Sequence, residues 1–569
     1  MISAISYLKQ KWHLIVLLFI WLYSAILQFI WLVLDRSPPW GDGISFVLRG
    51  MSLFQEHSIH GWEGFIRSLF RVYTYSFSPP VIEITYFLYY KIFGIASEME
   101  IMVNSLYLAL GIIGIYGIGN YLYDKYVGLF SALIFASLPG VILHAKSGFK
   151  EFHITCFLAL AIYLLFKAND FKNRRFSILF AISFAVMLLI KLESIIFIVF
   201  PLAFIGARAF SDKNCFRDSY RVITIIFVLI ITFAASFFWY ANNFFAYMQY
   251  LSHRVGANAG INSIYFSTKN TGFYAYLLYN VTFSKVQAVI FIAVSTYIVV
   301  KILSTGIKTP GLKQSLFLLI CFAFPFLVFT FLCEKDMSHI LPLSVFVSLI
   351  MASWCSIMRN KIAKYIIVFV VVLHCINIQL IPLYALGSKM KVTPFIVRAS
   401  PIDNILHRLR GKFNFPYGFE YNIAPEIWEP QLKSILEFID KDCNFVANNN
   451  SRKKPSVLLL ANLEPFRFFQ MEYCNMKIGS PISLINFLLE FQFLKEGIFS
   501  GKYDYIVTEQ PPFLQYLDNE ETSQLKMIYS FIEENQDEFN QRYKIVKAFE
   551  LPGLLEAVVY RSRNLERAQ

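Results

Sequence analysis

The sequence predicts a polytopic α-helical membrane protein that carries a small α/β domain at its C-terminal end. Three observations lead to this prediction. The chain of 569 residues is 57% hydrophobic and only 16% charged, whereas soluble globular chains average about 25% charged residues. Many of its apolar runs approach the length of about 20 residues that crosses the hydrocarbon core of a bilayer. Beyond residue 388 the apolar runs become shorter and alternate with amphipathic stretches, which is typical of an α/β domain.

Eleven apolar stretches are predicted as membrane spans because they are long and poor in charge. They cover residues 13–34, 99–122, 126–145, 152–167, 176–190, 193–207, 221–241, 286–302, 314–332, 340–357 and 364–383. A transmembrane domain is therefore expected at residues 1–387 and a separate α/β domain at residues 388–569. Within the second domain, strands are expected at residues 456–462, 503–509, 543–549 and 555–563, and helices at residues 426–440 and 520–539.

The apolar run PPVIEITYFLYYKIFG at residues 79–94 is not counted as a span. It opens with two prolines and contains Glu83 and Lys91, which suits a helix at the membrane interface better than a crossing. Without this run, 17 Lys and Arg residues of the short loops fall on one face of the membrane and four on the other. Since cytoplasmic loops are rich in Lys and Arg, the N-terminus is predicted to be cytoplasmic. The first long loop, residues 35–98, and the C-terminal domain are then expected outside the cytoplasm.

The net charge of +13 does not indicate a nucleic-acid partner, because the basic residues cluster in short loops between the spans. The eight cysteines are scattered along the chain and have no metal-binding spacing. Cys443 and Cys474 both lie in the polar tail. An extracytoplasmic location of this tail would be compatible with a disulfide between them.

The order of several motifs resembles that of a known family. The first span is followed by PPWGDGISF, by the proline-led segment SPPVIEITYFLYYKIFG, by SLPGVILHAKSGFKEFH, by LLIKLES and by a late HILPLSVF. This order is similar to that of the GT-C glycosyltransferases that use polyprenyl-phosphate sugars, in the branch that contains the protein O-mannosyltransferases and the lipid A aminoarabinose transferase. The resemblance covers most of the chain. It implies a GT-C fold with interfacial helices in the first outer loop.

The resemblance implies an inverting membrane glycosyltransferase. Such an enzyme would move a sugar from undecaprenyl phosphate to a hydroxyl of lipid A, O-antigen, a cell-wall glycan or a protein, at the outer face of a bacterial inner membrane. No metal is expected, because WGDG lacks the paired acid of the metal-dependent oligosaccharyltransferases. The alternative is a transporter of a lipid or glycan. Transporters place ionisable residues within spans near the midplane, whereas the notable charges of this chain lie in outer loops, which favours the enzyme.

Two acidic residues are the candidates for catalysis. Asp42 matches the family's acid at the start of the first outer helix, which implies that it is the general base for the acceptor hydroxyl. The alternative is that Asp42 only caps this helix. Glu151 matches the family's second acid, which implies that it orients the acceptor or tunes Asp42 through charge coupling. The alternative for Glu151 is an acid that stabilises a helix N-terminus.

Four basic residues are the candidates for binding the donor phosphate, namely Lys191, Lys150, Lys146 and Arg71. The three lysines lie on the face where the charge bias disfavours them, and a compact ammonium suits a phosphate. Ser78, Pro79, Pro80, Tyr86 and His339 are the candidates for the sugar and lipid groove. For Tyr86 the alternative is a place in the belt of aromatic residues at the membrane interface. Ser78 departs from the His or Lys that often precedes the two prolines in the family, which shifts the expectation toward Lys191 and Lys150. For His339 the alternative is a structural role, and for Arg71 it is a solvated charge of a loop.

Overall fold

The computed structural model describes most of the chain. The described residues are 2–34, 42–70, 79–95, 100–212, 217–245, 278–308, 311–331, 338–358, 360–384, 429–446, 454–461, 468–479, 482–486, 491–510, 520–551 and 555–567, with four single positions at 248, 272, 274 and 275. The chain divides into two compact units. One comprises residues 1–30, 52–89 and 99–406, and is called the helical unit below. The other comprises residues 31–51, 90–98 and 407–569. The predicted domain boundary at residue 387 lies outside the described residues.

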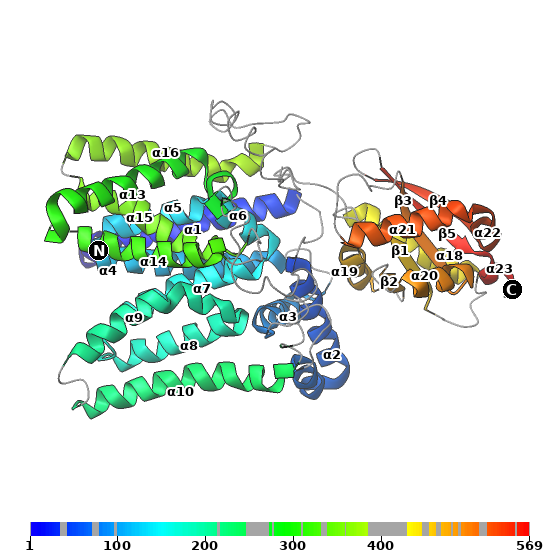
Figure 1. Ribbon diagram of the computed structural model, residues 1–569, viewed down its shortest axis with the longest axis horizontal. Coiled ribbons are helices and arrows are strands. Elements are labelled where there is room, and N and C mark those ends of the chain that lie inside the picture. The colour runs from blue at the N-terminus through cyan, green and yellow to red at the C-terminus, as the bar shows by residue number, and fades with distance from the viewer. Residues whose placement is uncertain are drawn as a thin grey trace. The chain divides into compact units, whose positions relative to one another are not determined.

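The first 384 residues form helices wherever the structure describes them as regular (Figure 1). In chain order these are α1 (Ile2–Leu34), α2 (Asp42–Phe70), α3 (Val81–Phe93), η1 (Glu100–Val103), α4 (Asn104–Leu122), α5 (Lys125–Ser137), α6 (Pro139–Ser147), α7 (Lys150–Lys167), α8 (Arg174–Ile190), η2 (Leu192–Ser194), α9 (Ile195–Ser211), α10 (Ser219–Asn242), η3 (Leu278–Thr282), α13 (Lys285–Thr305), η4 (Gly306–Lys308), α14 (Leu312–Phe331), η5 (Leu341–Leu343), α15 (Ser344–Ile357) and α16 (Lys361–Tyr384).

The prediction of a multi-pass helical membrane protein is confirmed. Each of the eleven predicted spans falls on one helix or on consecutive helices. By length and apolar composition, six helices among the described residues can cross a membrane, and the bent pair α5 and α6 makes a seventh. The exact number of eleven stays a prediction. The proline-led run forms α3, which has only 13 residues and is about 20 Å long, too short for a hydrocarbon core of about 30 Å.

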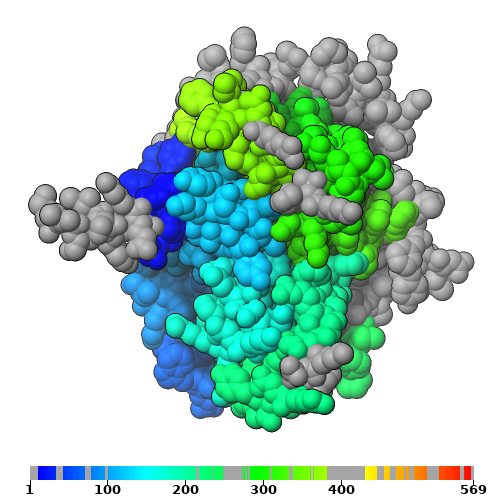
Figure 2. All heavy atoms as spheres, turned by 90° about the vertical axis from the view of Figure 1, so that its left-hand side faces the viewer, coloured from blue at the N-terminus to red at the C-terminus, as the bar shows by residue number. Residues whose placement is uncertain are grey.

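A row of glycines on α4 allows the central helices of the helical unit to pack closely. A Cβ atom on Gly114 would lie 2.4 Å from the carbonyl carbon of Ala159 in α7, and one on Gly119 would lie 2.7 Å from the Cα of Gly128 in α5. Such small residues let helix backbones approach where lipid offers no hydrophobic driving force. Figure 2, seen from the end that carries the N-terminus, shows the light blue α4–α5 region at the centre, between the dark blue of α1 and the green of later helices.

The predicted span 126–145 is a broken helix rather than a continuous one. Helices α5 and α6 meet at Leu138 with a bend of 57°, because Pro139 lacks an N–H and disfavours a helical conformation at the residue before it. The break frees carbonyl groups that must be satisfied within the protein. Gln379 of α16 donates to the carbonyl of Ala136 at 3.1 Å, and Gln287 of α13 donates to that of Ser137 at 3.4 Å.

The C-terminal residues of the second unit form an α/β fold. Its elements are α18 (Glu429–Val446), β1 (Ser456–Leu460), α19 (Phe468–Ile478), β2 (Ser483–Asn486), α20 (Phe491–Phe499), β3 (Tyr505–Gln510), α21 (Glu520–Glu534), α22 (Gln536–Arg542), β4 (Tyr543–Leu551), β5 (Leu555–Ser562) and α23 (Arg563–Arg567). The strand order is β2-β1-β3-β5-β4. Strands β2, β1 and β3 are parallel and β5 and β4 add an antiparallel hairpin. The four predicted strands are confirmed.

Side-chain contacts fix this sheet to its helices. Leu458, Ile506 and Leu494 are fully buried in one apolar cluster between the sheet and the helices. Asp442 of α18 accepts two hydrogen bonds from Arg561 of β5, at 2.8 and 2.9 Å, and one from the hydroxyl of Tyr505 at 2.8 Å. Cys443 and Cys474 are both buried and neither forms a disulfide, so the structure does not contain the bond that the tail's location would allow.

Candidate functional site

The structure describes most but not all of the predicted site residues. Asp42 is the first residue of α2, as expected from the sequence, but its side chain lies outside the described part of the chain. Arg71 and Ser78 also lie outside the described residues. Pro79 and Pro80 are buried and lead into α3, where their carbonyls accept hydrogen bonds from the backbone N–H groups of Val81 and Ile84.

The turn between α6 and α7 places three predicted residues close together in the chain. Helix α6 ends at Gly148, which has a left-handed conformation with φ of 74°. Glycine adopts this conformation without the steric cost that a side chain would add. Helix α7 then starts at Lys150 after a single extended residue. The turn thus joins Lys146, in the last turn of α6, to Lys150 and Glu151, in the first turn of α7.

The strongest contact between predicted site residues is an ion pair of Glu151 with Lys191. The Nζ atom of Lys191 lies 2.9 Å from the Oε1 atom of Glu151. Only 5% of the Glu151 side chain and 12% of the Lys191 side chain are exposed. Lys191 follows the last turn of α8 in an extended conformation. The α8–α9 junction therefore supplies the cation and α7 supplies the carboxylate.

The charges of further basic residues act on the same carboxylate. Burial by itself would raise the pKa of Glu151, but the charges of Lys191, Lys150 and His339 together lower it below its ordinary value. Glu151 directly precedes the predicted span 152–167 and is ionised at neutral pH. His339 lies just before η5, so a third segment of the helical unit contributes to this cluster. Three basic residues therefore act on one carboxylate, and lysines of this kind can also bind an anionic ligand.

The second oxygen of the Glu151 carboxylate is not satisfied by the protein. Its Oε2 atom is buried and has no hydrogen-bond partner among the residues that the structure describes. A buried acceptor without a donor costs on the order of 1–3 kcal/mol. The site therefore has a place for a ligand that donates a hydrogen bond, such as a hydroxyl group.

A hydrogen-bonded network that was not predicted from the sequence holds the start of α7 in place. The ring nitrogens of His153 lie 3.0 Å from the carbonyl oxygen of Phe149 and 3.0 Å from the Oδ1 atom of Asn104 in α4. The amide nitrogen of Asn104 donates to the carbonyl of Ala145 at 2.8 Å. Because both nitrogens of His153 have protein partners, the histidine is structural and positions the α6–α7 turn.

Tyr86 is close to this turn. It is fully buried, and a Cβ atom on Gly148 would lie 3.0 Å from its hydroxyl oxygen. Burial raises the pKa of Tyr86, so its hydroxyl remains protonated. The hydroxyl has no hydrogen-bond partner among the described residues. Of the predicted groove residues, Tyr86 and His339 thus lie beside the α6–α7 turn or face its carboxylate.

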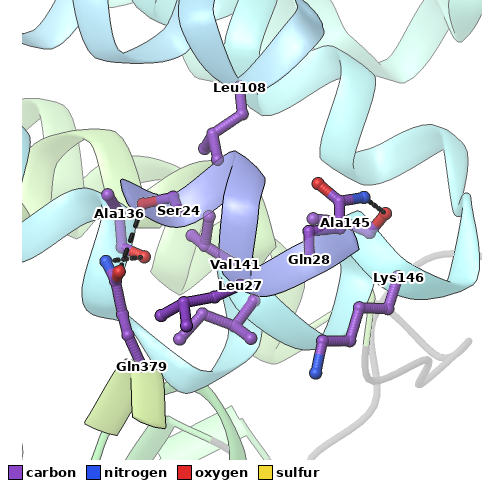
Figure 3. Close-up of a pocket in the computed structure, with 10 residues that line it drawn as sticks. Ser24, Leu27, Gln28, Leu108, Ala136, Val141, Ala145, Lys146 and Gln379 are labelled. Carbon is purple, nitrogen blue, oxygen red and sulfur yellow. Dashed lines mark hydrogen bonds between the residues drawn. The ribbon is translucent and has the colours of Figure 1, made fainter. Parts of the chain in front are cut away.

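A small pocket lies beside α6 in the helical unit (Figure 3). It is lined by residues of α1, α4, α5, α6 and α16: Ser24, Leu27, Gln28, Leu108, Ala136, Val141, Ile142, Ala145, Lys146 and Gln379. Its volume of about 30 Å³ is room for water but not for a sugar or a lipid chain. Ser24 donates to Gln379 at 3.2 Å, and Gln28 donates to the carbonyl of Ala145 at 3.2 Å. Figure 3 shows the ammonium of Lys146 directed away from the amide of Gln28. The pocket therefore does not bring the Lys146 ammonium together with that amide.

No group of three or more His, Cys, Asp or Glu side chains in the described part of the chain is arranged to hold a metal ion. The residues around the α6–α7 turn offer one carboxylate, Glu151, which is already paired with Lys191. The expectation that no metal is needed stays a prediction.

Comparisons with known proteins agree with the resemblance found in the sequence. The family model "Dolichyl-phosphate-mannose-protein mannosyltransferase" matches residues 78–239. No curated protein sequence matches the chain. The structure of ArnT from Cupriavidus metallidurans bound to undecaprenyl phosphate is similar, with a TM-score of 0.58 at 11% identity over 96% of this chain and 98% of that chain.

The chain has the GT-C fold. The apo state of the same ArnT gives a TM-score of 0.53 at 11% identity over 99% of both chains. The arabinofuranosyltransferase AftD from Mycobacteria gives 0.52 at 10% identity, over 97% of this chain and 40% of that chain. The GT-C fold expected from the sequence is therefore confirmed, and residues 78–239 match a glycosyltransferase family model. The family model covers α3 to α10, the part of the GT-C fold that contains Glu151 and Lys191.

Proposed function

We propose that the protein is an inverting glycosyltransferase that moves a sugar from a polyprenyl phosphate, such as undecaprenyl phosphate, to a hydroxyl acceptor. The observation that carries the proposal is the ion pair of Lys191 with the buried carboxylate of Glu151, on which the charges of Lys150 and His339 also act, in a chain with the GT-C fold. The undecaprenyl phosphate bound to ArnT is a ligand of this chemical class. The cations supply what a departing lipid phosphate requires, since its negative charge must be stabilised as the sugar leaves.

In this proposal Asp42 is the general base. It removes the proton of the acceptor hydroxyl, whose oxygen forms a bond to the anomeric carbon as the bond to the phosphate oxygen breaks. Lys191 and Lys150 bind the phosphate, with Lys146 and Arg71 as further cations on the same predicted face. Pro79, Pro80 and Ser78 lead into α3, which contributes Tyr86 to the groove. A single displacement of this kind inverts the configuration of the sugar.

The proposed location is the outer face of a bacterial inner membrane. The charge bias of the loops supports it, because 17 basic residues lie on the predicted cytoplasmic face and the proposed phosphate ligands lie on the other. The acceptor would be lipid A, O-antigen, a cell-wall glycan or a protein. The residues 388–569 are proposed to form an extracytoplasmic domain.

One structural feature is shared with transporters, namely the break between α5 and α6. In transporters such breaks line a binding site within the membrane. Here the carbonyls of Ala136 and Ser137 accept hydrogen bonds from the side chains of Gln379 and Gln287. They therefore do not need an ion to satisfy them. The glycosyltransferase is therefore the better supported function.

The proposal is tested with purified protein in lipid nanodiscs and a panel of undecaprenyl-phosphate sugars, by measuring release of undecaprenyl phosphate with membrane extracts as acceptor. Sugar-dependent release is expected for at least one donor. Asp42→Asn is expected to lower the rate of release at least 100-fold. Asp35→Asn, seven residues away at the end of the first span, is the matched control and is expected to leave this rate unchanged. Equal rates for Asp42→Asn and the unaltered protein would show that the base is another residue.

A further inference from the structure

The ion pair of Glu151 and Lys191 raises a question that the proposed function leaves open. A buried ion pair contributes little net stability, because both charges lose their hydration. The pair is nevertheless nearly enclosed, with 5% and 12% of the side chains exposed. In the proposed reaction the same lysine would have to bind the donor phosphate, which it cannot do fully while its ammonium neutralises a carboxylate.

The geometry of the contact suits a partner that can be exchanged. Lys191 contacts Glu151 through one oxygen only, Oε1, at 2.9 Å. An ammonium is a compact charge on a flexible four-carbon stem, and it forms point contacts rather than the two-pronged contacts of arginine. The backbone of Lys191 lies between α8 and η2, at the end of a helix rather than within one. Its side chain can therefore change partners without unwinding a helix.

The negative charge of Glu151 is still partly offset by positive charge when Lys191 leaves. The charges of Lys150 and His339 also act on Glu151, so departure of Lys191 does not leave the carboxylate without nearby positive charge. The Oε2 atom has no donor among the described residues even with Lys191 in place. After departure of the lysine, both oxygens would be able to accept hydrogen bonds from a ligand.

We propose that Lys191 is transferred between two anions during the reaction cycle. It neutralises Glu151 while the donor site is empty, passes to the phosphate of the incoming lipid donor, and so releases the Glu151 carboxylate to bind the acceptor hydroxyl. This inference rests on the proposed function. It makes Glu151 a positioning residue whose availability depends on the donor, and it implies that the donor binds before the acceptor.

An exchangeable ion pair and a permanent structural one respond differently when the charge of the Glu151 carboxylate is removed. If Glu151 and the phosphate compete for Lys191, Glu151→Gln frees the lysine and undecaprenyl phosphate binds more tightly. If the pair only holds Lys191 in position, the same substitution misplaces the lysine and binding weakens. The two cases therefore predict opposite signs for one measured affinity.

The experiment measures the Kd of undecaprenyl phosphate for the full-length protein in nanodiscs. Glu151→Gln is expected to lower Kd roughly tenfold, which corresponds to about 1.4 kcal/mol, and Lys191→Gln to raise it roughly tenfold. Combining the two substitutions is expected to cancel the gain in affinity that Glu151→Gln gives alone, because there is then no lysine to release to the phosphate. A higher Kd for Glu151→Gln, or an equal gain with and without Lys191, would overturn the inference.

Three controls separate the possible failures. Glu63→Gln removes an exposed carboxylate that pairs with Arg67 at 2.6 Å in α2, and it is expected to leave Kd unchanged. If Glu151→Gln does not fold, Glu151→Asp is tested instead, because its shorter side chain loses the 2.9 Å contact with Lys191. A lower Kd for this variant supports the inference, and a higher Kd overturns it. If the unaltered protein itself binds no undecaprenyl phosphate, the proposed function fails rather than the exchange of partners.

Discussion

The close contact of α4 with α7 predicts how much a side chain at Gly114 would destabilise the protein. In Gly114→Ala the new Cβ atom would lie 2.4 Å from the carbonyl carbon of Ala159, 2.7 Å from its oxygen and 2.5 Å from the nitrogen of Leu160. All three are backbone atoms of α7, so no side-chain rotation relieves the contact. To restore a separation of about 3.4 Å, the two helices must move apart by about 1 Å, and a gap of this size forfeits up to half of each nearby dispersion contact.

The expected cost combines two opposing effects. Overpacking of this kind costs about 1–3 kcal/mol, and a contact with fixed backbone atoms belongs at the upper end. Alanine recovers about 1 kcal/mol through its higher helix propensity. Gly114→Ala is therefore expected to lower the free energy of unfolding by about 2 kcal/mol.

The assay is thermal or denaturant unfolding of the detergent-purified protein, with Gly206→Ala as the matched control. A Cβ atom on Gly206, in α9, would meet nothing within 4 Å, so only the gain in helix propensity of up to about 1 kcal/mol remains. Gly114→Ala is expected to be less stable than the unaltered protein and Gly206→Ala at least as stable. Equal stability of the two variants would refute the argument that α4 needs glycine to approach α7.

Three further predictions follow from the ion pair, a helix cap and the metal question. Lys191→Met leaves Glu151 buried without its nearest cation and is expected to cost about 3 kcal/mol at pH 7. With Lys191 removed, Lys150 and His339 remain but the effect of burial is expected to outweigh them and raise the pKa of Glu151, so this loss should shrink as the pH falls from 7 to 5. The intact pair, whose carboxyl has a lowered pKa, should contribute constant stability over that range. Ser284→Ala removes the cap of α13 and a 2.7 Å hydrogen bond to His374 and is expected to cost about 1–2 kcal/mol, whereas Ser304→Ala, at an exposed position, should not change the unfolding curve. Treatment with EDTA should leave the transfer rate unchanged, and a loss that added Mg²⁺ restores would contradict the expectation of a metal-free reaction.

The positions of the helices could be predicted from the sequence because, in a chain this hydrophobic, a long apolar run is seldom anything but a membrane helix. The break at Leu138 was not predicted, although SLPG at residues 137–140 contains its cause. Strand β2 was also missed. It has four residues, SLIN, and is a strand because it pairs with β1, which its own sequence does not indicate.

The site could be predicted only in its parts. Glu151, Lys150 and Lys191 were each expected to contribute, and Asp42 was expected to open a helix, as it does. The pairing of Glu151 with Lys191 joins residues 40 positions apart and depends on how α7 and α8 align, and the local sequence carries no information on that alignment. The contact of His153 with Asn104 was missed for the same reason, because it joins residues 49 positions apart on helices that meet only in the folded protein.

The proposed function requires above all that the cations near Glu151 bind the phosphate of a polyprenyl donor. The most direct test is the affinity of undecaprenyl phosphate for the full-length protein and for Lys150→Gln with Lys191→Gln combined. We expect measurable binding that the double substitution weakens at least 100-fold, while the same substitutions at Lys172 and Lys361, on the predicted cytoplasmic face, leave the affinity unchanged. Binding that is equally strong in both double variants would contradict it.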